Sequence, residues 1–348
     1  MNISNIKTMS LMALLTMGAV ACNSDEPLPE IPASTGAVIS PEVGGTTQPN
    51  QVFIDLSTES TTVVNKDNWD LGFYNGDEFK VILNYASYTM ARPTTETDLA
   101  NVTDELVTQA YKDEMKDFLP NTEWKDAVDG DLSKTAIAEI SATDANNPVY
   151  VINRGVLDDA NTTERGFVKA RITLSGNDYI ITYGDINDAS GFSTITVPKS
   201  TTNDFTYISF DTNDIVEVAP PKGQWDIMMT TFFNEFDNQG EVLSFKFKDF
   251  SLTNHQYVKS VSVAGDQTAF DAFTIDDVAG LALANDRLAV GSSWRLFDFT
   301  TNEFAINNDI FYIIEDADGN VYKLKFTKML NDQGERGNPE FIYEILSE

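Results

Sequence analysis

The chain has 348 residues, and 42% of them are hydrophobic, so it can bury an interior large enough for two ordinary domains. Its 54 acidic residues outnumber 23 basic residues, which gives a net charge of −31. Because such a charge repels nucleic acid and anionic membrane surfaces, we exclude both as partners.

The N-terminus has the layout of a bacterial secretion signal. Lys7 is followed by the apolar stretch LMALLTMGAVA, which is too short to cross a membrane as a helix. Ala21 and Cys22 resemble the cleavage site of a bacterial lipoprotein, in which the cysteine becomes the lipidated first residue. We expect residues 1–21 to be a signal peptide and Cys22 to be lipidated; the alternative is a plain secretory signal.

The segment after Cys22 predicts where the protein resides. Residues 22–50 are rich in Pro, Ser, Thr and Gly, a composition typical of a flexible tether. The acidic start of this segment, NSDEP, resembles the signal that sends some lipoproteins to the outer face of the outer membrane. The sequence therefore predicts a surface-exposed outer-membrane lipoprotein.

A repeat organises the rest of the chain. The segment VFIDLST at 52–58 matches TYISFDT at 206–212, and each precedes a short segment that contains valine. A Trp-Asp run follows in both copies, as WDLGFYNG from Trp69 and as WDIMMTTFF from Trp225. Alternating faces place Leu71 and Phe73 with Trp69, and Ile227 and Met229 with Trp225, so we expect the tryptophan face to be the core face. We expect Asp70 and Asp226 to accept backbone N–H groups rather than to act in catalysis.

A Gly-Asn turn completes the repeat in the same order. It precedes a tyrosine-bearing strand in SGNDYIITY and again in DGNVYKLKF, as a β-hairpin requires. We therefore predict two tandem copies of one β unit, at 51–200 and 201–348, with Gly176 equivalent to Gly319.

Strand signals dominate both copies. Segments such as FKVILNY, VYVIN, FVKARITL, SFKFKDFSL and IFYIIED are rich in β-branched and aromatic residues. Helical spacing of apolar residues predicts one helix over Thr103–Leu119 and a shorter one within 268–283. The expected fold is mostly β, as two sandwich or half-barrel units with one or two short inserted helices.

Three features together resemble the HmuY family of surface haem-binding lipoproteins. They are the lipoprotein start, the WDL and WDI strands, and the C-terminal stretch GSSWR…FYIIEDADGNVYKLKFTKMLNDQGERGNPEFIYEIL. The resemblance extends from about Val52 to Leu346 and is to the longer members that carry the unit twice. It implies an all-β fold, an outer-membrane location, the capture of haem, and its delivery to a TonB-dependent receptor.

The resemblance also implies where a haem ligand should lie. Members of the family hold haem iron between two side chains, either two His or two Met, and one of them is the fifth residue after the tryptophan of the Trp-Asp strand. The matching positions here are Tyr74 and Thr230, and neither is His or Met.

The remaining residues offer three other candidate ligands, because haem iron accepts His, Met, Tyr or Cys. His255 is the single histidine of the chain, so ligation by two histidines of one molecule is excluded. Met228 shares the Asp face of its strand with Thr230, and Met90 is flanked by aromatic residues and Arg92. Each has a structural alternative: a turn histidine, or a methionine packed in a core.

The sequence does not favour an enzyme or a metal-ion site. One histidine and one cysteine cannot supply a nucleophilic catalytic set, and no phosphate loop or H-E-x-x-H motif is present. The segment DADGN at 316–320 fits a hairpin turn better than a calcium loop. The leading hypothesis is a haem-binding surface lipoprotein; the alternative is a non-haem surface binding or adhesion module with a glycan or protein ligand. A glycan-degrading enzyme would need a pair of acids in a cleft, and no motif singles out such a pair.

Overall fold

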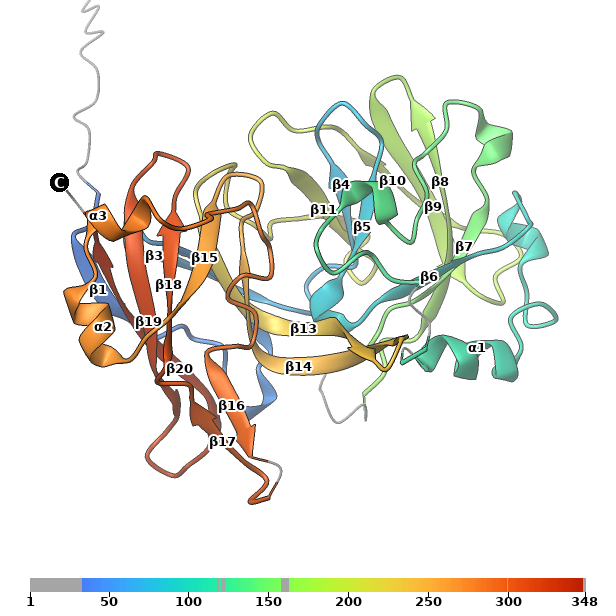
Figure 1. The fold of residues 1–348 in the computed structure, drawn as a ribbon. Helices are drawn as coiled ribbons and strands as arrows, with labels where there is room; N and C mark the ends of the chain where they lie inside the picture. The colour runs from blue at the N-terminus through green and yellow to red at the C-terminus, as the bar shows by residue number, and fades with distance from the viewer. Residues whose placement is uncertain (1–32, 118, 121–122, 158–162, 299, 347–348) are drawn as a thin grey trace, which may run out of the picture. The chain divides into compact units, whose positions relative to one another are not determined.

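The structure is a computed structural model that describes residues 33–117, 119–120, 123–157, 163–298 and 300–346. Over these residues the chain is mostly β, as the sequence predicts (Figure 1). No helix in these ranges is long and apolar enough to span a membrane. The expected signal peptide, Cys22 and the first part of the tether lie outside the described residues.

The first half of the chain contributes a five-stranded antiparallel sheet with the order β10-β9-β8-β7-β6. Its strands are Met90–Pro93 (β6), Val149–Asn153 (β7), Phe167–Ser175 (β8), Asp178–Asp185 (β9) and Ser193–Val197 (β10). The predicted Gly-Asn turn joins β8 to β9, and Gly176 has a φ of 64°, a left-handed conformation that glycine adopts without strain.

The second large sheet has the order β1-β20-β19-β18-β15. Its strands are Gly36–Ile39 (β1), Lys259–Ala264 (β15), Ile310–Glu315 (β18), Val321–Leu330 (β19) and Arg336–Ile345 (β20). Gly319, with a φ of 88°, stands in the turn between β18 and β19, as Gly176 does between β8 and β9. Four strands follow the same order in both sheets, which confirms the repeat; β1, at the blue end of the chain, adds beside the red β20 (Figure 1).

The two smaller sheets combine strands from both copies of the repeat. One has the order β12-β11-β4-β5 and the other β14-β13-β2-β3. Their strands are Asn50–Asp55 (β2), Ser60–Asn65 (β3), Leu71–Tyr74 (β4), Val81–Leu83 (β5), Phe205–Ser209 (β11), Asp214–Val216 (β12), Ile227–Asn238 (β13) and Glu241–Thr253 (β14). The hairpin β11–β12 of the second copy pairs with β4 of the first, and β2–β3 of the first pairs with β13 of the second. The copies therefore exchange hairpins. The bounds 51–200 and 201–348 describe units of the sequence, and as domain bounds they stay a prediction.

The helices are short. They are α1 (Gln109–Lys116), α2 (Gln267–Ala272) and α3 (Ile275–Val278), with single 3-10 turns at Gly45–Thr47, Tyr85–Ser87, Leu99–Asn101, Leu132–Lys134 and Asp144–Asn146. The helix expected over Thr103–Leu119 begins only at Gln109, because the Thr108 hydroxyl accepts the N–H of Tyr111 at 3.3 Å as an N-cap. A separate hairpin joins Arg295–Asp298 (β16) to Glu303–Ile306 (β17).

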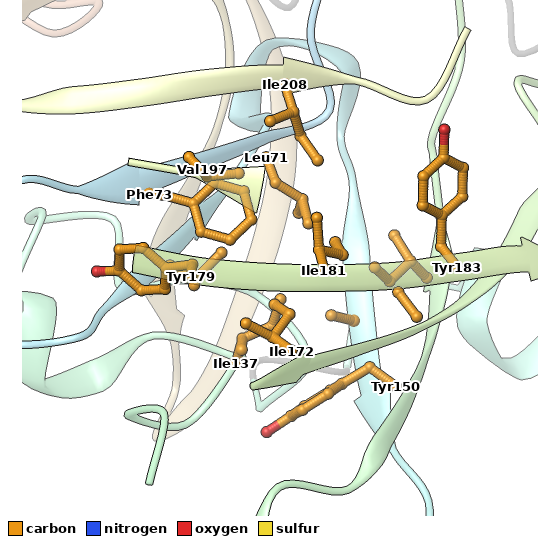
Figure 2. Close-up of a cluster of buried hydrophobic side chains, with 14 of the residues drawn as sticks. Leu71, Phe73, Ile137, Tyr150, Ile172, Tyr179, Ile181, Tyr183, Val197 and Ile208 are labelled. Carbon is orange, nitrogen blue, oxygen red and sulfur yellow. The ribbon is translucent and has the colours of Figure 1, made fainter. Parts of the chain in front are cut away.

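Each large sheet covers its own core. Figure 2 shows Leu71, Phe73 and Ile208, from the small sheet, packed against Tyr179 and Ile181 of β9. The second core repeats this plan, with Ile227 and Met229 of β13 packed among residues of β18, β19 and β20. Alternation along β4 and β13 therefore directs every second side chain into a core, as expected.

The two tryptophans do not share these cores, which corrects our prediction about the tryptophan face. Trp69 and the half-buried Trp225 belong instead to a central aromatic cluster that contains Phe53, Tyr207 and Met228. The physical reason is that each tryptophan precedes its strand: β4 begins at Leu71 and β13 at Ile227, so strand alternation does not reach the tryptophan. The cluster takes residues from both copies and is where the exchanged hairpins meet.

Candidate functional site

A cavity of about 80 Å³ opens into the central aromatic cluster. Both copies of the repeat supply its walls. The lining residues include Phe53, Ile82, Tyr85, Phe205, Tyr207, Trp225, Met228, Leu252, Asn254, His255 and Arg287. An adjoining cavity of about 30 Å³ shares five lining residues with the first: Ile82, Tyr85, Gly130, Leu132 and Arg287.

Met228 is brought to the first cavity by β13. Its side chain is buried, and its Sδ accepts hydrogen bonds from the Tyr85 hydroxyl and from Gln51 Nε2, each at 3.7 Å. Gln51 in turn accepts the indole N–H of Trp69 at 2.8 Å, so a chain of polar contacts runs from the first tryptophan to the sulfur. The sulfur is therefore positioned from the first copy although it belongs to the second.

The first copy has no counterpart to this methionine. Gly72 lies opposite Tyr207 in the first copy, and Met228 lies opposite Phe53 at the equivalent position of the second copy. A Cβ at Gly72 would lie 2.8 Å from Ile82 Cγ1 and 3.1 Å from the Tyr207 ring, so no larger side chain fits there without movement. The cavity is asymmetric for this reason: among the described residues, one sulfur atom lines it, that of Met228 from the second copy.

His255 follows β14 and lines the same cavity as Met228. The preceding Asn254 fixes the turn, because its side chain donates to the Trp225 carbonyl at 3.0 Å and its N–H donates to the Asp226 carbonyl at 2.8 Å. Burial, and next the charge of Arg287, lower the pKa of His255 to about 4. The imidazole is neutral at pH 7, which is the form that ligates a metal.

Tyr85 occupies in the first copy the place that His255 occupies in the second, a relationship that we did not expect from the sequence. Asn84 donates to the Trp69 carbonyl at 2.7 Å and to the Asp70 carbonyl through its N–H at 3.1 Å, as Asn254 does for Trp225 and Asp226. The sequence signal is an asparagine after each Trp-Asp hairpin, in LNY and in TNH. Burial raises the pKa of Tyr85, which keeps its hydroxyl protonated.

Arg287 supplies the positive charge of the site. Its guanidinium lies 4.9 Å from the Tyr85 ring centre and 5.3 Å from that of Phe232. It donates a long hydrogen bond of 3.5 Å to the Val128 carbonyl. The carboxyl group of Asp204 lines the same cavity and accepts a hydrogen bond from the Tyr257 hydroxyl at 2.7 Å, so the cavity combines one cation and one acidic group with apolar and aromatic walls.

The other three predicted site residues lie elsewhere. Met90 is buried in a different cavity, of about 140 Å³, with Tyr88 and Lys246. Tyr74 ends β4, where its ring packs against Phe205 at 5.5 Å outside the lining of the first cavity. Thr230 is buried, and its hydroxyl donates to the Thr231 carbonyl at 3.0 Å. The structure therefore places Met228 and His255 in the lining of one cavity, and Met90, Tyr74 and Thr230 outside that lining.

Arg92 does not stand beside Met90 as a ligand partner. Its guanidinium lies over the rings of Tyr111 and Trp124, at 4.2 Å and 4.3 Å, and pairs with Glu114 at 2.8 Å. These contacts support the structural interpretation of the Met90 segment, in which its flanking residues pack rather than bind.

The two Trp-Asp aspartates hold the exchanged hairpins, as the expectation of backbone N–H partners requires. Asp70 accepts the N–H of Phe210 at 2.7 Å, and Asp226 accepts the N–H of the equivalent Leu56 at 2.8 Å. Asp70 also pairs with Arg154 at 2.9 Å, whereas Asp226 has no guanidinium partner among the described residues. Burial raises the pKa of Asp226 to about 8, and the neighbouring carboxylates of Asp55 and Asp316 add to the effect.

The fold defines the class of the chain as a tandem-repeat, mostly-β protein with a small aromatic cavity at the junction of its repeats. The chain belongs to the HmuY family: the family model described as HmuY protein matches residues 47–182 and again 201–343. This family consists of binding proteins. No curated protein matches the chain.

Solved structures with similarity to the chain include a Tannerella forsythia HmuY analogue in its apo form, with 11% identity, a TM-score of 0.30, and coverage of 91% of this chain and 99% of that one. A HmuY-like protein from Bacteroides vulgatus that is proposed to bind haem has 11% identity, a TM-score of 0.23, and coverage of 92% and 100%. A protein from Bacteroides fragilis that is proposed to be a lipoprotein has 10% identity, a TM-score of 0.24, and coverage of 90% and 92%.

Proposed function

We propose that this protein is a surface lipoprotein that captures haem in the cavity between its two repeats, with His255 and Met228 as the candidate iron ligands. The observation that carries the proposal is that these two residues, from different segments of the second copy, line one aromatic cavity together with Arg287. Imidazole and thioether groups are both established haem ligands. Membership of the HmuY family supports haem as the ligand.

The cavity must widen to admit haem. Its volume of about 80 Å³ is below the range of roughly 300–1,000 Å³ that is usual for ligand pockets. The Met228 sulfur must also give up its contacts with Tyr85 and Gln51 before it can bind iron. We expect haem binding to break this pair of contacts and to separate Tyr85 from Met228.

A haem titration of the purified chain, followed by absorbance, tests the proposal. We expect a shifted Soret band that is altered in Met228→Leu and in His255→Gln, because each variant loses one ligand. Met90→Leu is the matched control, since Met90 lines a different cavity. Binding should be tighter with reduced haem, because a thioether favours ferrous iron more than imidazole does. The absence of a Soret shift in both redox states would remove haem as the ligand.

The small size of the cavity favours one alternative function, a non-haem surface binding or adhesion module. Trp225, Tyr85 and Arg287 suit a smaller ligand, such as a glycan end group or a peptide side chain, without any widening. A chain that shows no Soret shift but gains thermal stability with a soluble glycan or a peptide would support this alternative over haem.

The anchor is the second part of the proposal. We propose that Cys22 is lipidated, that the mature chain starts there, and that captured haem passes to a TonB-dependent receptor at the outer membrane. Lipoprotein acylation supplies the two or more chains that stable anchoring needs. A Cys22→Ser variant should be released as a soluble protein; a variant that stays in the membrane fraction in the wild-type amount would contradict lipidation.

A further inference from the structure

β15 lies at one edge of the second large sheet and is only partly covered on its outer side. Its inner side pairs with β18 along its whole length, from Lys259 to Ala264. On the outer side, Ser260 exchanges hydrogen bonds with Ala284, at 2.8 Å and 3.3 Å. This isolated bridge fixes which residues of β15 direct their backbone groups away from the sheet.

Ser262 and Ala264 direct their N–H and C=O groups outward as well, because main-chain groups alternate along a strand of an antiparallel ladder. Both residues are exposed, and neither forms an outer backbone hydrogen bond with any described residue. Gly265 continues the inner ladder, because its N–H donates to the Asp309 carbonyl at 2.9 Å, one residue beyond the pair of Ala264 with Ile310. Four backbone groups are therefore available on a short, defined length of strand edge.

A groove of about 470 Å³ lies beside the Ser260–Ser262 part of this edge, and Ala264 continues the edge outside the lining of the groove. Its described lining residues all differ from those of the cavity that contains Met228. Small side chains form most of its wall and leave room for a main chain to approach: Ser260, Ser262, Ala282, Ala284, Ala289, Gly291, Ser292 and Ser293. Asn234 also lines the groove, and its buried Oδ1 accepts no hydrogen bond from any described residue.

We infer that this groove binds a short extended peptide segment of another protein, which adds as a strand to the outer edge of β15. The backbone of the peptide would pair with Ser262 and Ala264, and one of its N–H or side-chain donors would reach Asn234 Oδ1. Asp286 is the one charged residue among the described residues of the lining, so the peptide should carry a Lys or Arg on that side. Strand addition draws its affinity from the main chain and its specificity from neighbouring side-chain positions.

The lining favours a peptide over a sugar. Among the described residues no aromatic ring lines the groove, whereas a sugar usually stacks on one, and the unpaired backbone groups of Ser262 belong to its wall. The groove is also polar and lined by small residues, so it does not provide the apolar floor that an amphipathic helix needs.

The test uses the full chain and a random heptapeptide phage library, followed by titration of the enriched peptides as synthetic compounds. Ser262→Pro and Ala264→Pro each remove one outward N–H, while the pairing of β15 with β18 does not use those groups. We expect each variant to weaken peptide binding about tenfold, because one backbone hydrogen bond is lost and the peptide is displaced. Ser262→Ala and Ala264→Ser are the matched controls and should change the affinity by less than about threefold.

Hydrogen exchange gives a second measurement that does not depend on the proline variants. The amides of Ser262 and Ala264 should exchange quickly in the free chain and become protected when the peptide is added. The inference is overturned if no peptide is enriched, if the enriched peptides bind Ser262→Pro and Ala264→Pro as tightly as wild type, or if the protection falls on another strand edge. Protection of these amides by a soluble glycan and not by the peptides would likewise overturn the inference.

Discussion

Asp70 accepts the backbone N–H of Phe210 at 2.7 Å and thereby holds a hairpin of the second copy against a strand of the first. Asp226 makes the same bond to Leu56 in the opposite direction. The Trp-Asp pair thus recurs because each copy uses it to fix the hairpin that the other copy provides. The aspartates differ in their surroundings, and this difference makes them separable by mutation.

Asp70→Asn should destabilise the protein strongly. The side chains of Arg154 and Arg165 pair with Asp70 and are 10% and 1% exposed, and the variant would leave both with only the exposed Asp211 as an anionic partner. We expect a loss of roughly 3 kcal/mol, as for other broken buried ion pairs. Urea unfolding at pH 7 measures it. Asp226→Asn is the matched control and should change the free energy of unfolding by less than about 1 kcal/mol, because that carboxyl is largely protonated at pH 7 and an amide oxygen can still accept the Leu56 N–H.

Stability should depend on pH through Asp226. Its pKa of about 8 in the folded state lies far above its value of 3.8 in the unfolded chain, so the folded state holds the extra proton between these two values. The free energy of unfolding should therefore fall as pH rises from about 4 to about 8 and level off above pH 8. Unfolding of wild type and Asp226→Asn between pH 6.5 and 9 isolates this group. Equal pH dependence in the two proteins would contradict the raised pKa.

The imidazole of His255 should remain neutral well below its usual pKa. Because it is the single histidine of the chain, its ring protons can be followed by NMR without assignment of the other residues. We expect a pKa of about 4, against an ordinary value of 6.5, and the free energy of unfolding should fall as pH drops from 6.5 to about 4. A titration midpoint near 6.5 in the folded protein would place the ring in solvent and outside the cavity.

Gly130→Ala should disturb the candidate site through that histidine. A Cβ at Gly130 would lie 2.6 Å from His255 Cε1, and the φ of Gly130 is 80°. We expect a loss of roughly 1–3 kcal/mol in the free energy of unfolding and a shift of the His255 pKa towards its ordinary value. Gly176→Ala is the control, since its φ is 64° but no atom of the part of the chain that the structure describes lies within 4 Å of the added Cβ. If both variants shift the pKa equally, contact with Gly130 does not fix the ring.

Cysteines at positions 74 and 205 should form a disulfide, because Tyr74 and Phe205 lie directly opposite each other in β4 and β11. The experiment uses a Cys22→Ser background and detects the bond by its shift in non-reducing electrophoresis. The pair Tyr74→Cys and Gln51→Cys is the control, because these positions would be opposite only if each hairpin paired within its own copy. A bond in the control pair and none in the test pair would exclude the exchange.

The sequence predicted the repeat, the strand content and the Gly-Asn turns because these depend on local patterns. Gly176 and Gly319 predict turns because glycine adopts the positive φ angles that such turns require and few other residues do. The exchange of hairpins could not be read in the same way. β2 resembles β11, so each presents an equally suitable edge to β4 and β13, and only tertiary contacts such as Asp70 with Phe210 decide between them.

The candidate site was predictable to a similar extent. Strand alternation placed Met228 on the face away from the core, and the single histidine drew attention to His255. Tyr85 was considered only as one of the aromatic residues that flank Met90, and Arg287 was missed, because an arginine in a loop carries no periodic signal. Their place becomes clear only when the exchange brings the segment at 84–85 opposite the segment at 254–255.

The exchange of hairpins has a consequence for resistance to proteases, which a surface protein of the kind we propose would encounter. The connection at 198–204, which leads from β10 to β11, is the natural place for a cut between the copies. In a protein with two independently folded domains, such a cut would release one domain from the other. Here the β2–β3 hairpin of the N-terminal fragment would still pair with β13 of the C-terminal fragment, and β11–β12 of the C-terminal fragment would still pair with β4. The two fragments of a cleaved molecule would therefore stay associated.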